Sequence, residues 1–159
     1  MNQNSSIEIC KILNLSQQRL RGWVTDTLNF FKPSIKQSGG SGQKAIYSYS
    51  DLLSYATFQY LIEVLAMDRN LAIKIVNQIR KHLKRSFNDY FIVSLESVPN
   101  DKKSRRVLVS KVDPLNQSEF LMTFFNDSNE PLTGSWEANI IINLHQIKTY
   151  IDRRIKEIG

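Results

Sequence analysis

Residues 5–24 read SSIEICKILNLSQQRLRGWV, a stretch that predicts two short helices joined by a tight turn. Ser5 and Glu8 have the spacing of a capping box, in which each side chain accepts a hydrogen bond from the other residue's backbone amide. We therefore expect the first helix to begin near Ser6. Its apolar face follows a spacing of three and four residues and consists of Ile9, Ile12 and Leu13.

The second helix is expected to start at Ser16, a favoured N-cap residue, with Leu15 packed across its first turn. A step of 100° per residue divides this helix into two sides. The buried side consists of Leu20, Trp23, Val24 and Thr27. The opposite side is polar and carries Gln18, Arg21, Gly22 and Thr25, flanked by Gln17 and Arg19.

That polar side has the chemistry of a surface that enters a nucleic-acid groove. Gln pairs in two ways with an adenine edge, and Arg pairs with guanine or holds a phosphate. Gly22 adds no side chain that would keep the helix away from a backbone. The alternative is an ordinary solvated helix face, and the residues that follow favour the groove.

Residues 28–52 read LNFFKPSIKQSGGSGQKAIYSYSDL, which predicts a two-stranded wing. Pro33 excludes helix, Ile35 and residues 45–49 alternate as strands do, and residues 38–43 form a Gly/Ser tip between them. Three lysines lie on the wing: Lys32, Lys36 and Lys44. Ser50 followed by Asp51 is expected to cap the next helix.

The succession IEICKILNLS, RLRGW, FKPS, a Gly-rich turn and YSYSDL before a long apolar helix resembles the DNA-binding domain of the mercury-resistance regulator (MerR) family. The resemblance covers roughly residues 7–84 and is nearest to MerR-like winged helix-turn-helix domains outside the metal sensors. In that family the second helix enters the major groove and the wing grips flanking phosphates. Gly22 departs from the family pattern, which has an aromatic residue there, and no long pairing helix follows directly after the domain.

The resemblance implies a set of DNA-binding residues. Ser16, Gln17, Gln18 and Arg19 would approach bases or adjacent backbone, Arg21 would hold a phosphate, and the wing contacts would be Lys36, Lys44 and Tyr47. The helix expected at residues 51–67 is apolar around most of its circumference, so it should have more than one packing partner. It would pack on the helix-turn-helix and on either the C-terminal half or a second subunit.

Charge is concentrated in the half that carries these residues. The chain has 159 residues, a net charge of +6 and 42% hydrophobic residues, enough for a real core. Residues 1–86 contain 12 Lys and Arg against 5 Asp and Glu, a balance of +7, whereas the rest is at −1. This positive charge favours a nucleic-acid partner for residues 1–86, and the alternatives are a solvated surface and a membrane-facing one. No apolar run has spanning length and no signal pattern begins the chain, which disfavours a membrane.

The remaining sequence predicts an α+β chain of two domains. Helices are expected at residues 51–67 and 71–84, the second ending in Arg80, Lys81, Lys84 and Arg85, which would contact phosphate or simply suit a helix C-terminus. The periodicity then becomes alternating, so we place a boundary between residues 1–86, the DNA-binding domain, and residues 87–159, a small effector or dimerisation module.

This module is expected to be an antiparallel sheet with a C-terminal helix. Strands are predicted at residues 90–98, 107–112, 119–125 and 140–142, with residues 99–106 as a turn. Asn143 and Gln146 have the spacing of a cap for the last helix, whose stripe consists of Leu144, Ile147, Ile151, Ile155 and Ile158. That stripe would cover the sheet or pair with its copy in a second chain.

No enzyme, cofactor or metal site is predicted. His82 and His145 have no Cys or carboxylate at metal-ligand spacing, and residues 39–44, GGSGQK, lack the Gly-Lys-Ser/Thr order of a phosphate loop. Cys10 is the single cysteine; we expect a small core residue rather than a sensor, and a reducing, cytoplasmic setting.

The sequence thus predicts a sequence-specific, DNA-binding transcriptional regulator that acts as a homodimer on a two-fold site. Two alternatives remain. One is a DNA-bending or recombination accessory factor, and the other is an antitoxin or adaptor whose C-terminal half holds a protein partner or small effector.

Overall fold

The computed structural model describes residues 4–25, 32–36, 44–83, 90–98, 101–112 and 136–158, and its chain divides into two compact units. The first unit combines Met1–Met67 with Ile147–Gly159, and the second is Asp68–Gln146. This division differs from the one expected at residue 86. The last helix returns to the N-terminal unit, and the helix that begins at Arg69 belongs with the sheet.

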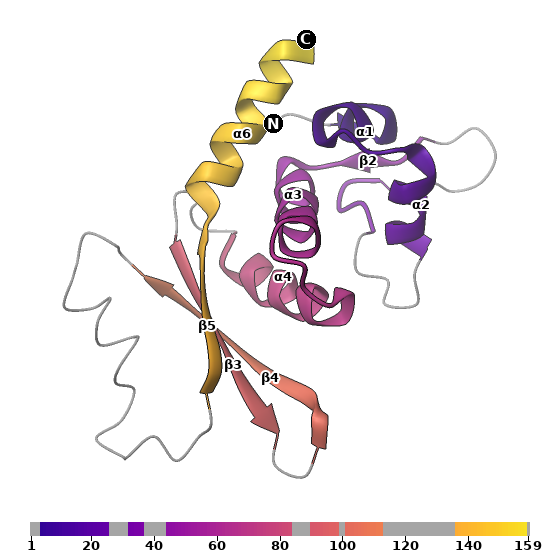
Figure 1. Ribbon diagram of the computed structural model, residues 1–159. Coiled ribbons are helices and arrows are strands. Elements are labelled where there is room, and N and C mark those ends of the chain that lie inside the picture. Colours follow the sequence, from indigo (N-terminus) through magenta and orange to yellow (C-terminus); the bar gives the residue numbers. More distant parts are fainter. Residues whose placement is uncertain are drawn as a thin grey trace. The chain divides into compact units, whose positions relative to one another are not determined.

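The first unit is built mainly from short helices (Figure 1). Its elements from residue 4 to residue 63 are β1 (Asn4–Ser5), α1 (Ser6–Leu13), α2 (Gln17–Thr25), β2 (Ile46–Tyr47) and α3 (Tyr49–Glu63). Strands β1 and β2 pair antiparallel, with Asn4 opposite Tyr47 and Ser5 opposite Ile46. The first two helices begin within one residue of the positions predicted from their capping residues.

Helix α3 lies at the centre of the first unit. Every residue from Asp51 to Phe58 is buried, as expected for a helix that is apolar around most of its circumference. Its bounds differ from the predicted residues 51–67, because Ser48 rather than Ser50 is the N-cap. The Ser48 hydroxyl accepts a hydrogen bond from the amide of Asp51, and the Asp51 carboxylate accepts one from the amide of Ser48.

Helix α6 (Leu144–Ile158) supplies the second partner of α3. It starts where predicted, since Asn143 accepts a hydrogen bond from the amide of Gln146. From Ile147 onward it belongs to the first unit and lies beside α1 and α3 (Figure 1). Of the two predicted uses of its apolar stripe, covering the sheet is wrong for Ile151, which is fully buried within the first unit, whereas pairing with a second chain stays a prediction.

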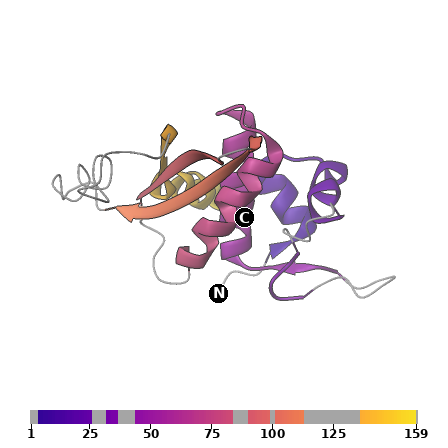
Figure 2. The ribbon, with the colours of Figure 1, turned by 90° about the horizontal axis from the view of Figure 1, so that it is seen from below.

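The second unit contains α4 (Arg69–Leu83) and a three-stranded antiparallel sheet of order β4-β3-β5. Its strands are β3 (Tyr90–Val98), β4 (Asp101–Val112) and β5 (Trp136–Asn143). Strands β3 and β4 lie side by side in Figure 2. Phe91, Val93 and Leu95 alternate along β3 and are buried, as predicted, and α4 packs against β4.

Helix α4 starts two residues before the predicted residue 71, because the carboxylate of Asp68 accepts hydrogen bonds from the amides of Asn70 and Leu71. The predicted turn at residues 99–106 is too long, since β4 already begins at Asp101, opposite Val98. Four basic residues there suggested a loop, but charged residues are common on outer strands. The predicted strand at residues 119–125 lies outside the described residues. The fold class, mixed helix and small antiparallel sheet, is confirmed.

Candidate nucleic-acid interface

The turn between α1 and α2 is fixed by local hydrogen bonds. Asn14 has the left-handed conformation, with φ 53° and ψ 48°, which Asn tolerates better than most residues. The amide of Leu15 then donates to the carbonyl oxygen of Cys10 at 2.8 Å. The hydroxyl of the next residue, Ser16, accepts from the amide of Arg19 at 3.1 Å and caps α2. The buried Leu15 anchors this turn to the core, and this fixes the direction in which α2 leaves the turn.

The two sides of α2 differ as the sequence predicts. Leu20 and Trp23 are only 2% and 5% exposed, and the Trp23 ring packs edge-on against Phe58 with centroids 5.0 Å apart. The exposed residues of α2 and its cap are Ser16, Gln17, Gln18, Arg19, Arg21 and Gly22. A Cβ atom built on Gly22 meets nothing within 4 Å, so this part of the helix backbone is open to a large neighbour.

The start of α2 also favours an anionic neighbour. Its first turn contains no acidic residue, and the first amides of a helix carry partial positive charge. The structure thus brings the helix N-terminus, two glutamines and Arg21 to one exposed side. The guanidinium of Arg19 forms an ion pair with Glu63 of α3.

Two residues of the segment predicted to form a wing are paired with each other. Lys36 and Ile46 form an antiparallel bridge, in which each amide donates to the other's carbonyl oxygen at 3.1 and 2.9 Å. The side chains of Lys36 and Lys44 are exposed, as is Lys32. The Gly/Ser tip at residues 38–43 and Thr27 of the predicted buried side lie outside the described residues.

Tyr47 does not belong to the surface of the wing. Its side chain is 2% exposed and its ring lies 5.7 Å from that of Tyr55, in an edge-on arrangement. The pairing of β2 with β1 was not expected from the sequence, and it encloses Tyr47 between Asn4 and α3. The predicted contact of this side chain with DNA is therefore wrong, and Tyr47 is a core residue.

A buried carboxylate holds the wing against α3, and sequence reasoning did not find this role. Asp51 is 2% exposed and accepts from the amide of Ser34 at 3.0 Å and from its hydroxyl at 2.6 Å. The Ser34 hydroxyl also lies 2.9 Å from that of Ser48. These contacts fix the segment that leads to Lys36 relative to α3. The S-Y-S-D sequence showed a cap, but nothing in it indicated a partner 17 residues earlier.

Cys10 is buried, and burial raises the pKa of its thiol. A buried thiol of this kind is a poor nucleophile, which agrees with the predicted core role. Within the described ranges, no group of three or more His, Cys, Asp or Glu side chains is placed to hold a metal ion. No helix of those ranges is long and apolar enough to cross a membrane.

No protein-family model matches this chain, and no curated protein matches it either. The resemblance to MerR-like domains therefore rests on the residues quoted above.

Proposed function

We propose that this chain is a sequence-specific DNA-binding regulator of transcription, with a MerR-like winged helix-turn-helix formed by α1, α2 and the wing. The observation that carries the proposal is the exposed polar side of α2, which presents Gln17, Gln18 and Arg21 while Leu20 and Trp23 fix the helix to the core. Helices used in this way present their N-terminal residues to base edges in the major groove.

The chemistry of the side chains supports different roles within one interface. Gln17 and Gln18 carry the amide groups that pair with adenine, and Arg21 carries the guanidinium group that pairs with guanine or holds a phosphate. Lys36 and Lys44 are exposed point charges on the wing, suited to phosphates on the flank of a groove. The sequence places a charge of +7 in residues 1–86, so counterion release would supply much of the affinity.

A homodimer on a two-fold site forms part of the proposal, because one such module makes few base contacts. The predicted use of the long apolar helix as the dimer contact does not fit its burial, since Asp51–Phe58 is enclosed within the first unit. The dimer would therefore use other surfaces, and its existence is checked by measuring the mass of the protein in solution.

The proposal is tested by fluorescence anisotropy of labelled duplex DNA with the full chain at increasing salt. We expect binding to random duplex whose affinity falls steeply with salt, and tighter binding to sequences selected from a random pool. A flat salt response would remove the DNA-binding function. Equal affinity for selected and random duplexes would leave binding but remove the sequence-specific regulator, and a gel-shift bend assay would then test the architectural alternative.

A further inference from the structure

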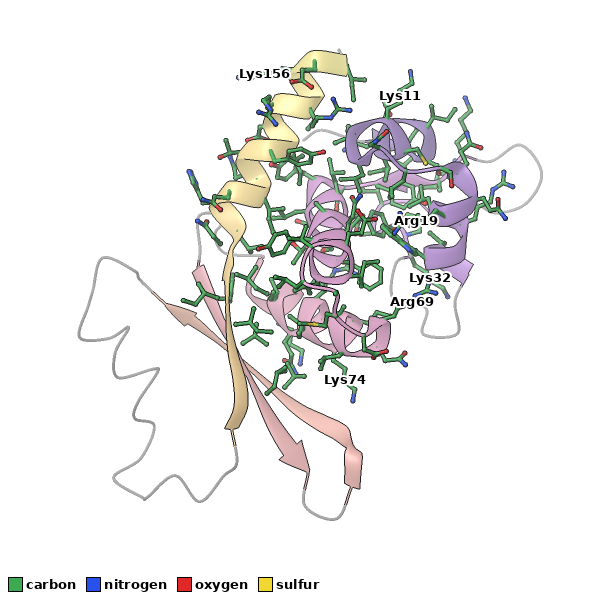
Figure 3. The ribbon with its side chains drawn as sticks, viewed as in Figure 1. Lys11, Arg19, Lys32, Arg69, Lys74 and Lys156 are labelled. Atoms are coloured by element: carbon green, nitrogen blue, oxygen red, sulfur yellow. The ribbon has the colours of Figure 1, made fainter. Side chains whose placement is uncertain are left out.

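Arg19 lies on the predicted DNA-binding helix but is bound to the protein itself. Its Nη2 atom lies 2.5 Å from Oε1 of Glu63, the last residue of α3. Figure 3 shows the Arg19 side chain between α2 and α3. Its guanidinium carbon also lies 5.6 Å from the centroid of the Trp23 ring, within cation–π range. Both the charge and one face of the guanidinium therefore have partners inside the first unit.

The partner of Arg19 is itself held. Oε2 of Glu63 accepts a hydrogen bond from Nε2 of Gln59 at 2.9 Å, and the same Nε2 donates to the carbonyl oxygen of Leu13 at 3.3 Å. Leu13 is the last residue of α1. A continuous set of contacts thus runs from α2 through α3 to the end of α1. We call these four residues, Arg19, Glu63, Gln59 and Leu13, the polar clamp.

We propose that the polar clamp sets the angle at which α2 is presented to DNA, and that Arg19 is a positioning residue rather than a reader of bases. The inference rests on the proposed function. A phosphate would compete with Glu63 and with the Trp23 ring for the guanidinium. Because Glu63 already neutralises Arg19, this residue adds little to counterion release. The pair is partly exposed, at 46% and 35%, so its importance lies in orientation more than in stability.

Exchanging the two charges separates a clamp from a DNA contact. The double variant Arg19→Glu with Glu63→Arg keeps the net charge and allows the ion pair to form in reverse. We expect Arg19→Glu alone to weaken binding to the selected duplex about tenfold and the double variant to recover most of that loss. If Arg19 contacts phosphate, the exchanged variant binds as weakly as Arg19→Glu, and the proposal is overturned.

Salt dependence gives a second readout, with Arg21→Gln as the control that removes the same charge from the same helix. We expect Arg21→Gln to lower the salt slope by about 0.9. Arg19→Gln should weaken binding and change the preferred sequence while leaving the slope unchanged. An equal fall in slope for both variants would show that Arg19 holds a phosphate.

The clamp is also tested without DNA, so that its failure is distinct from failure of the proposed function. Thermal unfolding of the full chain should show a Tm lower by about 2–4 °C for Arg19→Glu and a recovery in the exchanged variant. If the wild type binds no duplex, the proposed function fails and with it the role of Arg19 in DNA recognition. If Tm does not recover in the exchanged variant, the polar clamp is wrong whatever the DNA assay gives.

Discussion

The hydroxyl of Tyr49, the first residue of α3, donates a hydrogen bond of 2.7 Å to Oδ1 of Asp152 on α6, 103 positions later in the chain. The other carboxylate oxygen of Asp152 accepts from Nζ of Lys148 at 2.8 Å. One oxygen of this carboxylate therefore holds α6 against α3, whereas the other is paired with a lysine of α6 itself. Such an arrangement makes the docking of α6 sensitive to pH.

The pKa values of the two groups are shifted in opposite directions. Burial raises the pKa of Asp152, but the hydrogen bonds from Lys148 and Tyr49 and the charges of Lys148 and Lys156 outweigh it, so the pKa is lowered overall. Burial, followed by the hydrogen bond to Asp152, raises the pKa of Tyr49 well above its usual value. Asp152 therefore stabilises the fold above its unfolded-state pKa of about 4, and this is lost as pH falls through the lower folded value. Tyr49 stabilises it below about pH 10, and this is lost as pH rises through the raised value.

Replacing Tyr49 with Phe should lower the free energy of unfolding by about 1 kcal/mol at neutral pH, because one hydrogen bond to a carboxylate of a partly exposed pair is removed. The difference between wild type and variant should shrink at both ends of the pH range, as either partner titrates. Urea unfolding at a series of pH values measures this difference in the free energy of unfolding. A difference that stays constant from acid to alkaline pH would contradict the assignment.

Ser48, and not Ser50, should be the serine that α3 requires. Ser48 accepts from the amide of Asp51 and lies 2.9 Å from the hydroxyl of Ser34, so Ser48→Ala should cost about 1 kcal/mol of stability. Ser50→Ala, two residues later in the same turn, is the matched control and should change stability by less than about 0.5 kcal/mol. The two losses are compared by thermal unfolding, and equal losses would remove Ser48 as the cap.

These serines illustrate what a single sequence reveals about this fold. The Ser5–Glu8 box, the Ser16 cap and the Asn143 cap were predicted correctly, since each depends on residues only three positions apart. Ser48 and Ser50 are both plausible N-caps, since each stands shortly before Asp51. The contact of Asp51 with Ser34 that accompanies the true cap spans 17 positions. Local spacing identified the helix but gave the wrong cap, Ser50 in place of Ser48.

Long-range partners left no pattern in the sequence. The isoleucine stripe of α6 correctly indicated a buried face, yet its location in the first unit depends on contacts such as that of Asp152 with Tyr49. Tyr47 was misplaced for the same reason, because β1 pairs with β2 more than forty positions later. The exposed side of α2, by contrast, followed from helical periodicity alone. The pairing of Arg19 with Glu63 did not, since many carboxylates were equally available.

Arg154 should be needed for docking of α6 on α1. Its guanidinium donates to the carbonyl oxygens of Lys11 at 3.2 Å and Ile12 at 3.3 Å, which lie in the last turn of α1. The last carbonyls of a helix have no partner one turn further along it, and that of Lys11 otherwise accepts a long bond of 3.4 Å from the amide of Asn14. Arg154→Met should therefore lower the free energy of unfolding by about 1–2 kcal/mol.

The neighbouring Arg153→Met provides the control for Arg154. Arg153 is 67% exposed and faces Glu157 and the Tyr150 ring on its own helix, so its loss should cost less than about 0.5 kcal/mol. Amide hydrogen exchange in α1 gives the specific readout. Faster exchange at the end of α1 is expected in the Arg154 variant alone, and identical exchange in both variants would contradict the docking role.

Tyr47 and Lys44 should separate stability from DNA binding. Tyr47→Ala removes a buried ring and should cost about 3–5 kcal/mol of stability, whereas Tyr47→Phe keeps the ring and should leave the DNA salt slope unchanged. Lys44→Ala should leave stability within about 0.5 kcal/mol and lower the salt slope by about 0.9. Unfolding and anisotropy measured on the same samples check both. A lowered slope in Tyr47→Phe would return this residue to the interface.

Gln18 and Arg21 should differ in what they contribute to recognition, although both lie on the exposed side of α2. Gln18 offers an amide that pairs with a base edge, so Gln18→Ala should reduce the preference for the selected duplex by about 1–3 kcal/mol and barely change binding to random duplex. Arg21→Ala should weaken binding to both duplexes, because it removes a charge that acts on phosphates of any sequence. Competition between selected and random duplexes measures the two effects separately. If Gln18→Ala binds every duplex as the wild type does, Gln18 reads no base, and this counts against groove reading by α2.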